Sequence, residues 1–124
     1  MSAIEYTIEP SLHLMQASID GSIRFLDLVN LLTRLRKDPQ WGPAVQSLLI
    51  VDTSARMESV EPASLRSFFQ KVLEASGSHK WAIVVLGMQY RSLFSDALGH
   101  LPASRVQLRM FDDEYTALRW LKTG

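Results

Sequence analysis

Residues 47–62 read SLLIVDTSARMESVEP, and this stretch decides the fold. Four consecutive apolar residues, 48–51, are typical of a parallel strand that is covered by helices on both faces. The apolar run ends at Asp52, and Pro62 suits the first turn of a helix. The stretch therefore predicts a central strand over 47–52, followed by a helix.

The chain continues downstream with the same two kinds of pattern. Apolar residues at helical spacing predict a helix over 62–75, and another continuous apolar run predicts a strand over 81–86. We expect a helix over 89–98 and then a strand over 105–111, where apolar and polar residues alternate as at a sheet edge. The acidic stretch Asp112-Asp113-Glu114 starts the last helix, since acidic residues cap free amides and stabilise the positive end of a helix dipole.

Upstream of the central strand, residues 4–8 alternate between apolar and polar types, which predicts a strand with one wet face. The Pro10-Ser11 pair breaks this strand, and a more apolar strand is expected over 12–19. The short break favours an antiparallel hairpin. A helix is predicted over 24–36, and Trp41 in the loop behind it is expected to pack over a core edge.

This order of elements predicts an α/β fold. Helices that alternate with strands imply parallel strands joined by right-handed crossovers. We therefore expect a single mixed five-stranded sheet, mostly parallel with an N-terminal hairpin, and four helices on both faces. The length of 124 residues corresponds to one domain over 1–124.

The composition excludes several classes of function. No cysteine is present, so disulfides, thiolate metal sites and cysteine catalysis are ruled out. Thirteen basic residues balance thirteen acidic ones, and such a chain lacks the broad positive field that draws a protein to nucleic acid. No apolar run is long enough to span a membrane and no signal peptide is visible, so we expect a cytoplasmic protein.

Asp52 lies where parallel α/β proteins collect their functional groups, at the carboxyl end of a strand. A phosphoacceptor aspartate of the response-regulator type would need an acidic pair after the first strand, a hydroxyl after the fourth and a lysine after the last. The fourth strand is followed by Gly87-Met88 and the fifth by Asp112. We therefore predict that Asp52 accepts backbone hydrogen bonds in the turn that leaves the sheet.

Metal and nucleotide sites are not indicated. His13, His79 and His100 have no second histidine or acid at a spacing that builds a metal site. The few glycines are scattered, and no phosphate-binding loop or nucleophile elbow occurs. We expect no metal and no cofactor.

The remaining residues at the strand ends are apolar. The candidate ligand-binding residues are Met57, Met88, Tyr90, Met110 and Phe111. Thioethers and aromatic rings at such a rim favour a pocket for a lipophilic molecule, or for the apolar face of a protein partner. The alternative is ordinary core, in which methionine fills gaps under loops.

Five segments resemble the SpoIIAA-like family, relatives of the STAS and lipid-carrier folds. They are residues 31–35, the pair 38–39, and residues 49–52, 81–85 and 110–121. The last is the most specific: a phenylalanine, a short acidic cap, an alanine and a Trp-Leu pair. The resemblance implies the same mixed sheet and no enzymatic activity.

The STAS relatives imply a second kind of function. They act as anti-sigma-factor antagonists that are switched by phosphorylation of a serine in an Asp-Ser-x-Gly stretch. The equivalent stretch here is Glu58-Ser59-Val60-Glu61, which lacks that motif. Asp52, Ser54 and Ser59 are the regulatory candidates under this hypothesis.

Three hypotheses stay open at this point. The first and preferred one is a non-enzymatic module that binds a small lipophilic molecule. The second is a STAS-like regulatory domain that docks on a protein partner without the usual phosphoserine motif. The third is an enzyme built around Asp52. A homodimer is also expected, because exposed sheet edges and helix faces often pair symmetrically.

Overall fold

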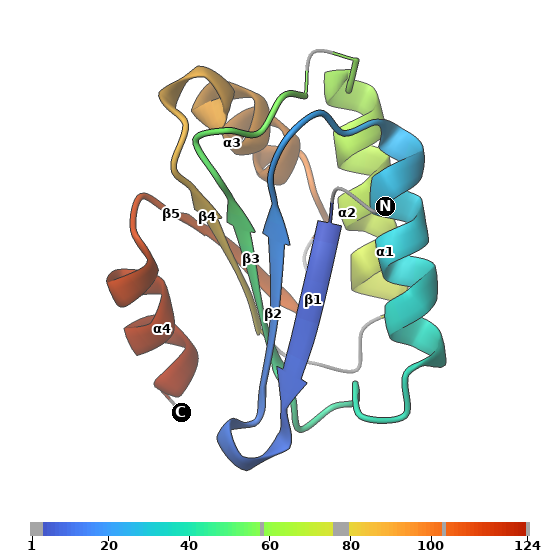
Figure 1. Ribbon diagram of the computed structural model, residues 1–124, viewed down its shortest axis with the longest axis vertical. Coiled ribbons are helices and arrows are strands. Elements are labelled where there is room, and N and C mark those ends of the chain that lie inside the picture. The colour runs from blue at the N-terminus through green and yellow to red at the C-terminus, as the bar shows by residue number, and fades with distance from the viewer. Residues whose placement is uncertain (1–3, 58, 76–79, 103, 124) are drawn as a thin grey trace.

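The computed structural model describes residues 4–57, 59–75, 80–102 and 104–123, and within them the chain forms the predicted α/β fold (Figure 1). The strands are β1 (Ile4–Glu9), β2 (Leu14–Ile19), β3 (Gln46–Val51), β4 (Lys80–Val85) and β5 (Gln107–Phe111). The helices are α1 (Phe25–Lys37), α2 (Pro62–Ala75), α3 (Arg91–Gly99) and α4 (Glu114–Lys122). Two short 3-10 helices, η1 (Pro10–Leu12) and η2 (Met88–Tyr90), complete the described elements.

The strands lie in the sheet in the order of the chain, β1-β2-β3-β4-β5. β1 runs antiparallel to β2, and the other neighbouring pairs are parallel. The mixed sheet with an N-terminal hairpin is therefore confirmed. β3 is the middle strand, in agreement with its unbroken apolar run, and β5 is an edge strand, in agreement with its alternation.

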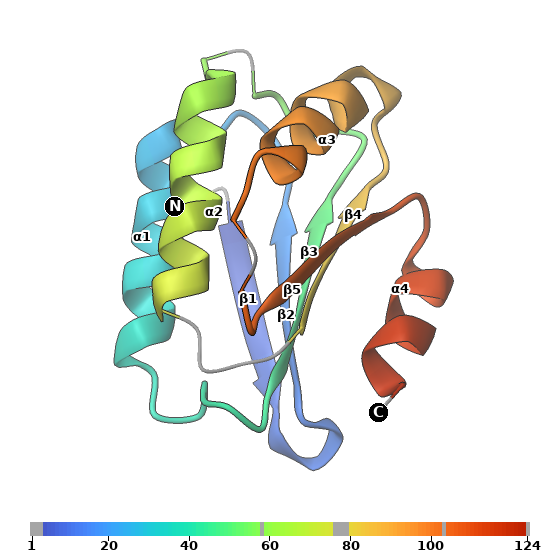
Figure 2. The ribbon, with the colours of Figure 1, turned by 180° about the vertical axis from the view of Figure 1, so that it is seen from behind.

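One face of the sheet carries three helices and the other carries one (Figures 1 and 2). Each crossover from β2 to β5 steps in the same direction across the sheet. Right-handed crossovers then place α1, α2 and α3 on the same face. α4 follows the last strand and packs on the opposite face, mostly against β4.

Two cores result from this arrangement. The larger core, under α1, α2 and α3, includes Trp81, Phe68, Phe69 and Phe94, all fully buried. The smaller core lies under α4 and consists of Leu48, Ala82, Val84, Phe111, Ala117 and Leu121. Because α4 is the only described helix on its face, the part of that face over β1 and β2 is open, and β1 presents exposed Glu5, Thr7 and Glu9 there.

Three predicted elements, the second strand, the third helix and the last strand, begin two residues later than expected. The second strand begins at Leu14 rather than Leu12, because Pro10 starts a 3-10 turn that His13 closes with a left-handed φ of 52°. The third helix begins at Arg91, after the 3-10 turn of η2, and the last strand begins at Gln107, after a bend.

The helices are short compared with a lipid bilayer. The longest described helix, α2, has 14 residues, whereas a membrane-spanning helix needs about 20. Among the residues that the structure describes, no helix combines the length and the apolar character needed to cross a membrane.

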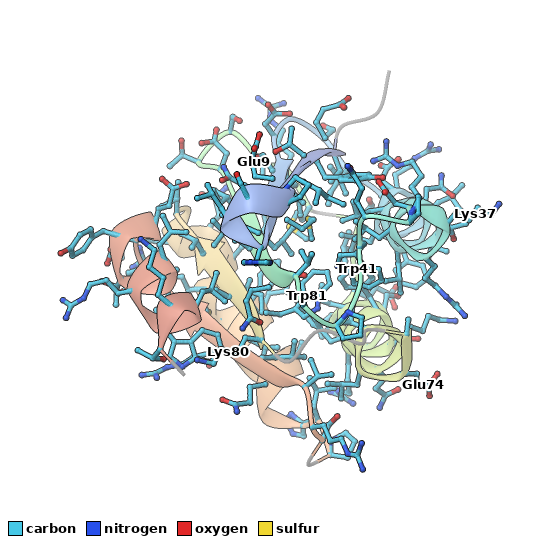
Figure 3. The ribbon with its side chains drawn as sticks, turned by 90° about the horizontal axis from the view of Figure 1, so that it is seen from below. Glu9, Lys37, Trp41, Glu74, Lys80 and Trp81 are labelled. Atoms are coloured by element: carbon cyan, nitrogen blue, oxygen red, sulfur yellow. The ribbon has the colours of Figure 1, made fainter. Side chains whose placement is uncertain are left out.

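Trp41 lies at the end of the sheet where the parallel strands begin (Figure 3). Its ring meets that of Trp81 edge-on, with 6.1 Å between the centroids. Its indole Nε1 donates a hydrogen bond to Ser47 Oγ at 3.2 Å. Trp41 therefore packs over an edge of the larger core, as predicted.

Candidate functional site

Hydrogen bonds join two of the loops at the carboxyl ends of the strands. Arg56, in the loop after β3, donates from its amide to Gly21 O at 2.7 Å and accepts from the amide of Ile23 at 2.9 Å. Gly21 lets the two loops come this close because its φ is +68°, a backbone conformation that residues with a side chain rarely adopt. At the next loop, the amide of Leu86 donates to Val51 O at 3.0 Å, one residue beyond the end of β4. We call the loops over 20–23, 52–57, 59–60 and 86–90 the rim.

Asp52 closes the turn at the centre of the rim. Its Oδ2 accepts from the hydroxyl of Ser54 at 2.6 Å and from the amide of Ser54 at 3.2 Å. These hydrogen bonds hold the pKa of Asp52 below the usual aspartate value, with the hydroxyl contributing most. The prediction that Asp52 accepts hydrogen bonds in the turn is confirmed. A carboxylate with a lowered pKa is a weak general base.

Met57 and Tyr90 meet inside the protein rather than at a pocket. Both are buried, and the amide of Met57 donates to the Tyr90 hydroxyl oxygen at 2.8 Å. The bond joins the loop after β3 to η2, across 33 residues of sequence. Here the structure agrees with the alternative of ordinary core: both side chains are buried, and the Tyr90 hydroxyl ties the backbone of the β3 loop to η2.

The other three candidate ligand residues point in different directions. Met88 is 78% exposed at the rim. Met110 is half-buried against the larger core, whereas Phe111 is buried in the smaller core on the opposite face of the sheet. The five candidates therefore do not share one face of the sheet.

The two candidate serines lie at the rim with their hydroxyls engaged. Ser54 donates to Asp52, and Ser59 Oγ donates a long hydrogen bond of 3.4 Å to the carbonyl of Ile23. Both residues are exposed. Glu58, which precedes Ser59, lies outside the described residues.

The two described histidines lie in different parts of the fold, and His100 Nδ1 is 3.8 Å from the Asp96 carboxylate. His13 closes the η1 turn, and His100 Nδ1 lies 2.8 Å from the carbonyl of Asp96 at the end of α3. His79 lies outside the described residues. Within the described part of the chain, no group of three His, Asp or Glu side chains could hold a metal ion.

A groove that the sequence did not predict lies between α4, β2 and η1. Its volume is about 520 Å³. The lining residues are Leu12, His13, Leu14, Gln16, Gln46, Glu114, Leu118, Leu121 and Lys122. Leu12, at the turn of the hairpin, is 67% exposed. We call this hollow the α4 groove.

The α4 groove exists because one helix covers a face that is five strands wide. Leu14 alternates with the core residues of β2 and so points to the α4 face, where it is only half-buried. Leu118 and Leu121 belong to the apolar stripe of α4. Each leucine fits the pattern of its own element, and only their position beside an uncovered part of the sheet makes them a lining.

No model of a known protein family, no curated protein and no solved structure matches this chain.

Proposed function

We propose that this chain is a non-enzymatic binding module that holds a small lipophilic molecule in the α4 groove. The observation that carries the proposal is a hollow of about 520 Å³ lined by four leucines from η1, β2 and α4. Ligand sites commonly have volumes of roughly 300–1,000 Å³ and mostly apolar walls. Leu12, at 67% exposed, loses its contact with water when an apolar molecule fills the groove.

The polar residues at the border of the groove narrow the class of ligand. Lys122 and His13 both line it, and the amides of Gln16 and Gln46 add donors and acceptors. Glu114 lies at the other end of α4 from Lys122. An apolar molecule with one acidic head group suits this arrangement, with its head beside Lys122 and its body on the leucines.

Two features of the rim support a role without catalysis. The lowered pKa of Asp52 leaves its carboxylate a weak base, and its Oδ2 already accepts from Ser54. Met57 and Tyr90, two of the candidate pocket residues, are buried, and the Met57 amide donates a hydrogen bond to the Tyr90 hydroxyl. The rim then serves as a rigid end of the sheet, and binding belongs to the groove.

The test is a titration of the purified protein with parinaric acid, a fluorescent fatty acid, together with native mass spectrometry of the protein as isolated. We expect saturable binding. Leu12→Ser removes an exposed contact and should weaken binding by about tenfold, since burying one leucine contributes roughly 1.5–3 kcal/mol. Leu26→Ser is the matched control, because Leu26 is 54% exposed on α1, on the other face of the sheet.

Lys122→Glu distinguishes the contribution of the acidic head group to binding from that of the apolar body. This variant should weaken binding of the fatty acid but leave binding of the corresponding fatty alcohol unchanged. Empty protein that does not bind parinaric acid would overturn the proposal. Equal effects of Leu12→Ser and Leu26→Ser would show that the probe binds elsewhere.

A second candidate function is a STAS-like regulatory domain that docks on a protein partner through the rim. The observation that favours it is Met88, a large apolar side chain that is 78% exposed beside loops held by hydrogen bonds. Affinity capture from the native host with wild type, Met88→Asp and Leu12→Ser tests it. A partner that Met88→Asp loses and Leu12→Ser retains would favour the rim over the groove.

A further inference from the structure

The two edges of the sheet differ in how they are protected. At β1, the guanidinium of Arg34 on α1 donates from Nη2 to the carbonyl of Ile4 at 2.8 Å and lies over the Tyr6 ring. The Tyr6 hydroxyl donates to Asp38 at 2.8 Å. Side chains from α1 and the residue after it therefore contact β1 and occupy one of its backbone carbonyls. β5 pairs with β4 on one side, and no described strand lies on its other side (Figure 2).

β5 presents a cationic face toward the side of the sheet that carries α4. Gln107 and Arg109 are exposed there, and Arg105 precedes the strand and is also exposed. Among the described residues, no carboxylate lies within ion-pair distance of Arg105 or Arg109. The Arg109 guanidinium stacks over the Phe111 ring at 5.3 Å, which holds the charge beside the strand.

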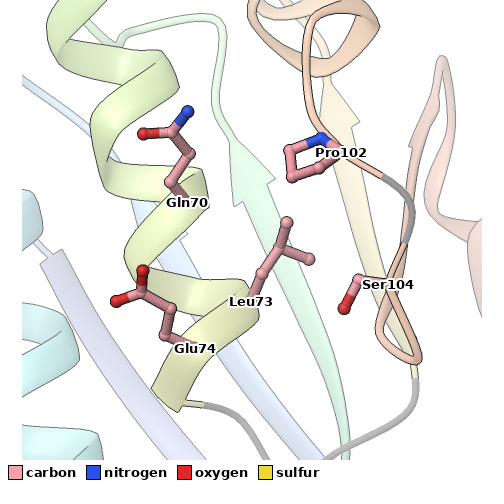
Figure 4. Close-up of a pocket in the computed structure, with 5 residues that line it drawn as sticks. All are labelled: Gln70, Leu73, Glu74, Pro102 and Ser104. Atoms are coloured by element: carbon pink, nitrogen blue, oxygen red, sulfur yellow. The ribbon is translucent and has the colours of Figure 1, made fainter.

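The opposite face of β5 borders two hollows, and the smaller one is lined mostly by apolar residues. Leu108 lines a hollow of about 180 Å³ together with Leu73, Leu98 and Leu101. A second hollow, of about 370 Å³, adjoins it and shares Leu73, Pro102 and Ser104 with it, but its wall also contains the polar side chains of Gln70 and Glu74 (Figure 4). The free edge therefore has positive charge on one side and leucine-lined space on the other.

We propose that the free edge of β5 accepts an extended segment of a partner protein as a sixth strand, and that this segment alternates acidic and apolar residues. Successive side chains of a strand point to opposite faces. An acid at every second position then faces Arg109 and Arg105, and the residues between them enter the hollows beside Leu108. Backbone hydrogen bonds supply affinity in this mode, and side chains on alternate faces supply specificity.

Two charges limit the register of the segment. Asp112 and Asp113 follow β5 directly and are exposed. They repel an acid placed at the end of the strand, so the acids of the partner are confined to the positions beside Arg109 and before it. This inference does not depend on the α4 groove.

A second copy of this chain suits the same edge poorly. An antiparallel pair of β5 strands that overlap over all of Gln107–Phe111 is centred on Arg109. It places Arg109 directly opposite its own copy, and like charges opposite each other destabilise a strand pair. The charge of the edge thus favours an acidic partner over self-pairing.

The test uses three short fluorescein-labelled peptides and fluorescence anisotropy with the full chain. The first alternates glutamate and valine, the second alternates lysine and valine, and the third is the first with N-methyl groups on alternate amides. We expect the first to bind at least about tenfold more tightly than either of the others. The amide signals of 107–111 should shift in nuclear magnetic resonance spectra when the first peptide is added.

Charge reversal at the edge provides the matched variants. Arg109→Glu should weaken binding of the glutamate peptide and strengthen binding of the lysine peptide. Arg36→Glu is the control, because Arg36 is an exposed arginine near the end of α1. Equal binding of the three peptides, or no binding of any, overturns the proposal. Concentration-dependent dimers in sedimentation that Arg109→Glu alters also overturn it, because a second copy would then occupy the edge.

Discussion

The ammonium group of Lys80 holds the last turn of α4 by donating to the carbonyl of Trp120 at 2.9 Å. It also donates to Thr123 O at 2.6 Å and to Thr123 Oγ1 at 2.9 Å, and it lies over the Trp120 ring. The last carbonyls of a helix have no partner within the helix. Lys80, from the first position of β4, supplies a donor from outside the helix, in addition to the amide and hydroxyl of Thr123 that also donate to the Trp120 carbonyl. These contacts attach the C-terminal end of α4 to the sheet.

Lys80→Met should therefore destabilise the protein by about 1–3 kcal/mol, because it removes three hydrogen bonds of a charged donor while the length of the side chain is nearly kept. The free energy of unfolding in urea measures the effect. Lys71→Met is the control, since Lys71 is an exposed lysine on α2. If both variants unfold at the same urea concentration, Lys80 does not hold α4.

Tyr90→Phe tests whether the rim is closed. The Tyr90 hydroxyl accepts from the buried amide of Met57, and phenylalanine would leave that amide unpaired. The expected loss is about 1–3 kcal/mol in the free energy of unfolding. Tyr115→Phe should change stability by less than about 0.5 kcal/mol, because Tyr115 is 71% exposed. A neutral Tyr90→Phe would mean that water reaches Met57, as in an open pocket.

Much of the fold could be predicted because its main signals are local. The apolar run over 48–51 indicates a strand that is buried on both faces. The alternation of apolar and polar residues over 4–8 and 105–111 indicates strands near the edges of the sheet. Alternating helices and strands then imply parallel pairing. What no local pattern encodes is the order of the strands. That order places three helices on one face and leaves the other to α4.

The candidate site could be predicted less well, for related reasons. Met110 and Phe111 are adjacent in a strand, so their side chains point to opposite faces of the sheet. This was visible in the sequence. The burial of Met57 and Tyr90 was not, since it depends on how two distant loops meet. The role of Leu12 depends on which part of the sheet α4 leaves uncovered.

Trp41 and Ser47 should be energetically coupled. The buried hydroxyl of Ser47 accepts from the indole of Trp41, and Trp41→Phe removes that donor. A double-mutant cycle with Ser47→Ala should give a coupling free energy of about 0.5–1.5 kcal/mol, measured by urea unfolding. The cycle cancels the loss of indole packing, which both backgrounds share. Additive effects of the two substitutions would mean that packing alone places the ring of Trp41.

Ser54 should control the pKa of Asp52, because its hydroxyl and amide both donate to the Asp52 carboxylate. Ser54→Ala removes the stronger donor and should raise this pKa toward the usual aspartate value, as followed by carboxyl resonances in a pH titration. Asp113, the N-cap of α4, is the internal control: hydrogen bonds from Thr116 lower its pKa in the same way, and Ser54→Ala should leave it unchanged.

The lowered pKa of Asp52 also predicts how the stability of the protein changes with pH. A carboxylate whose pKa is lower in the folded state stabilises the protein above the unfolded pKa of about 3.9, and this contribution is lost as pH falls through the folded value. The stability difference between wild type and Ser54→Ala should therefore shrink as the pH falls through that window. A difference that is constant from neutral to acidic pH would show that the Ser54 hydroxyl acts on the turn without acting on the charge of Asp52.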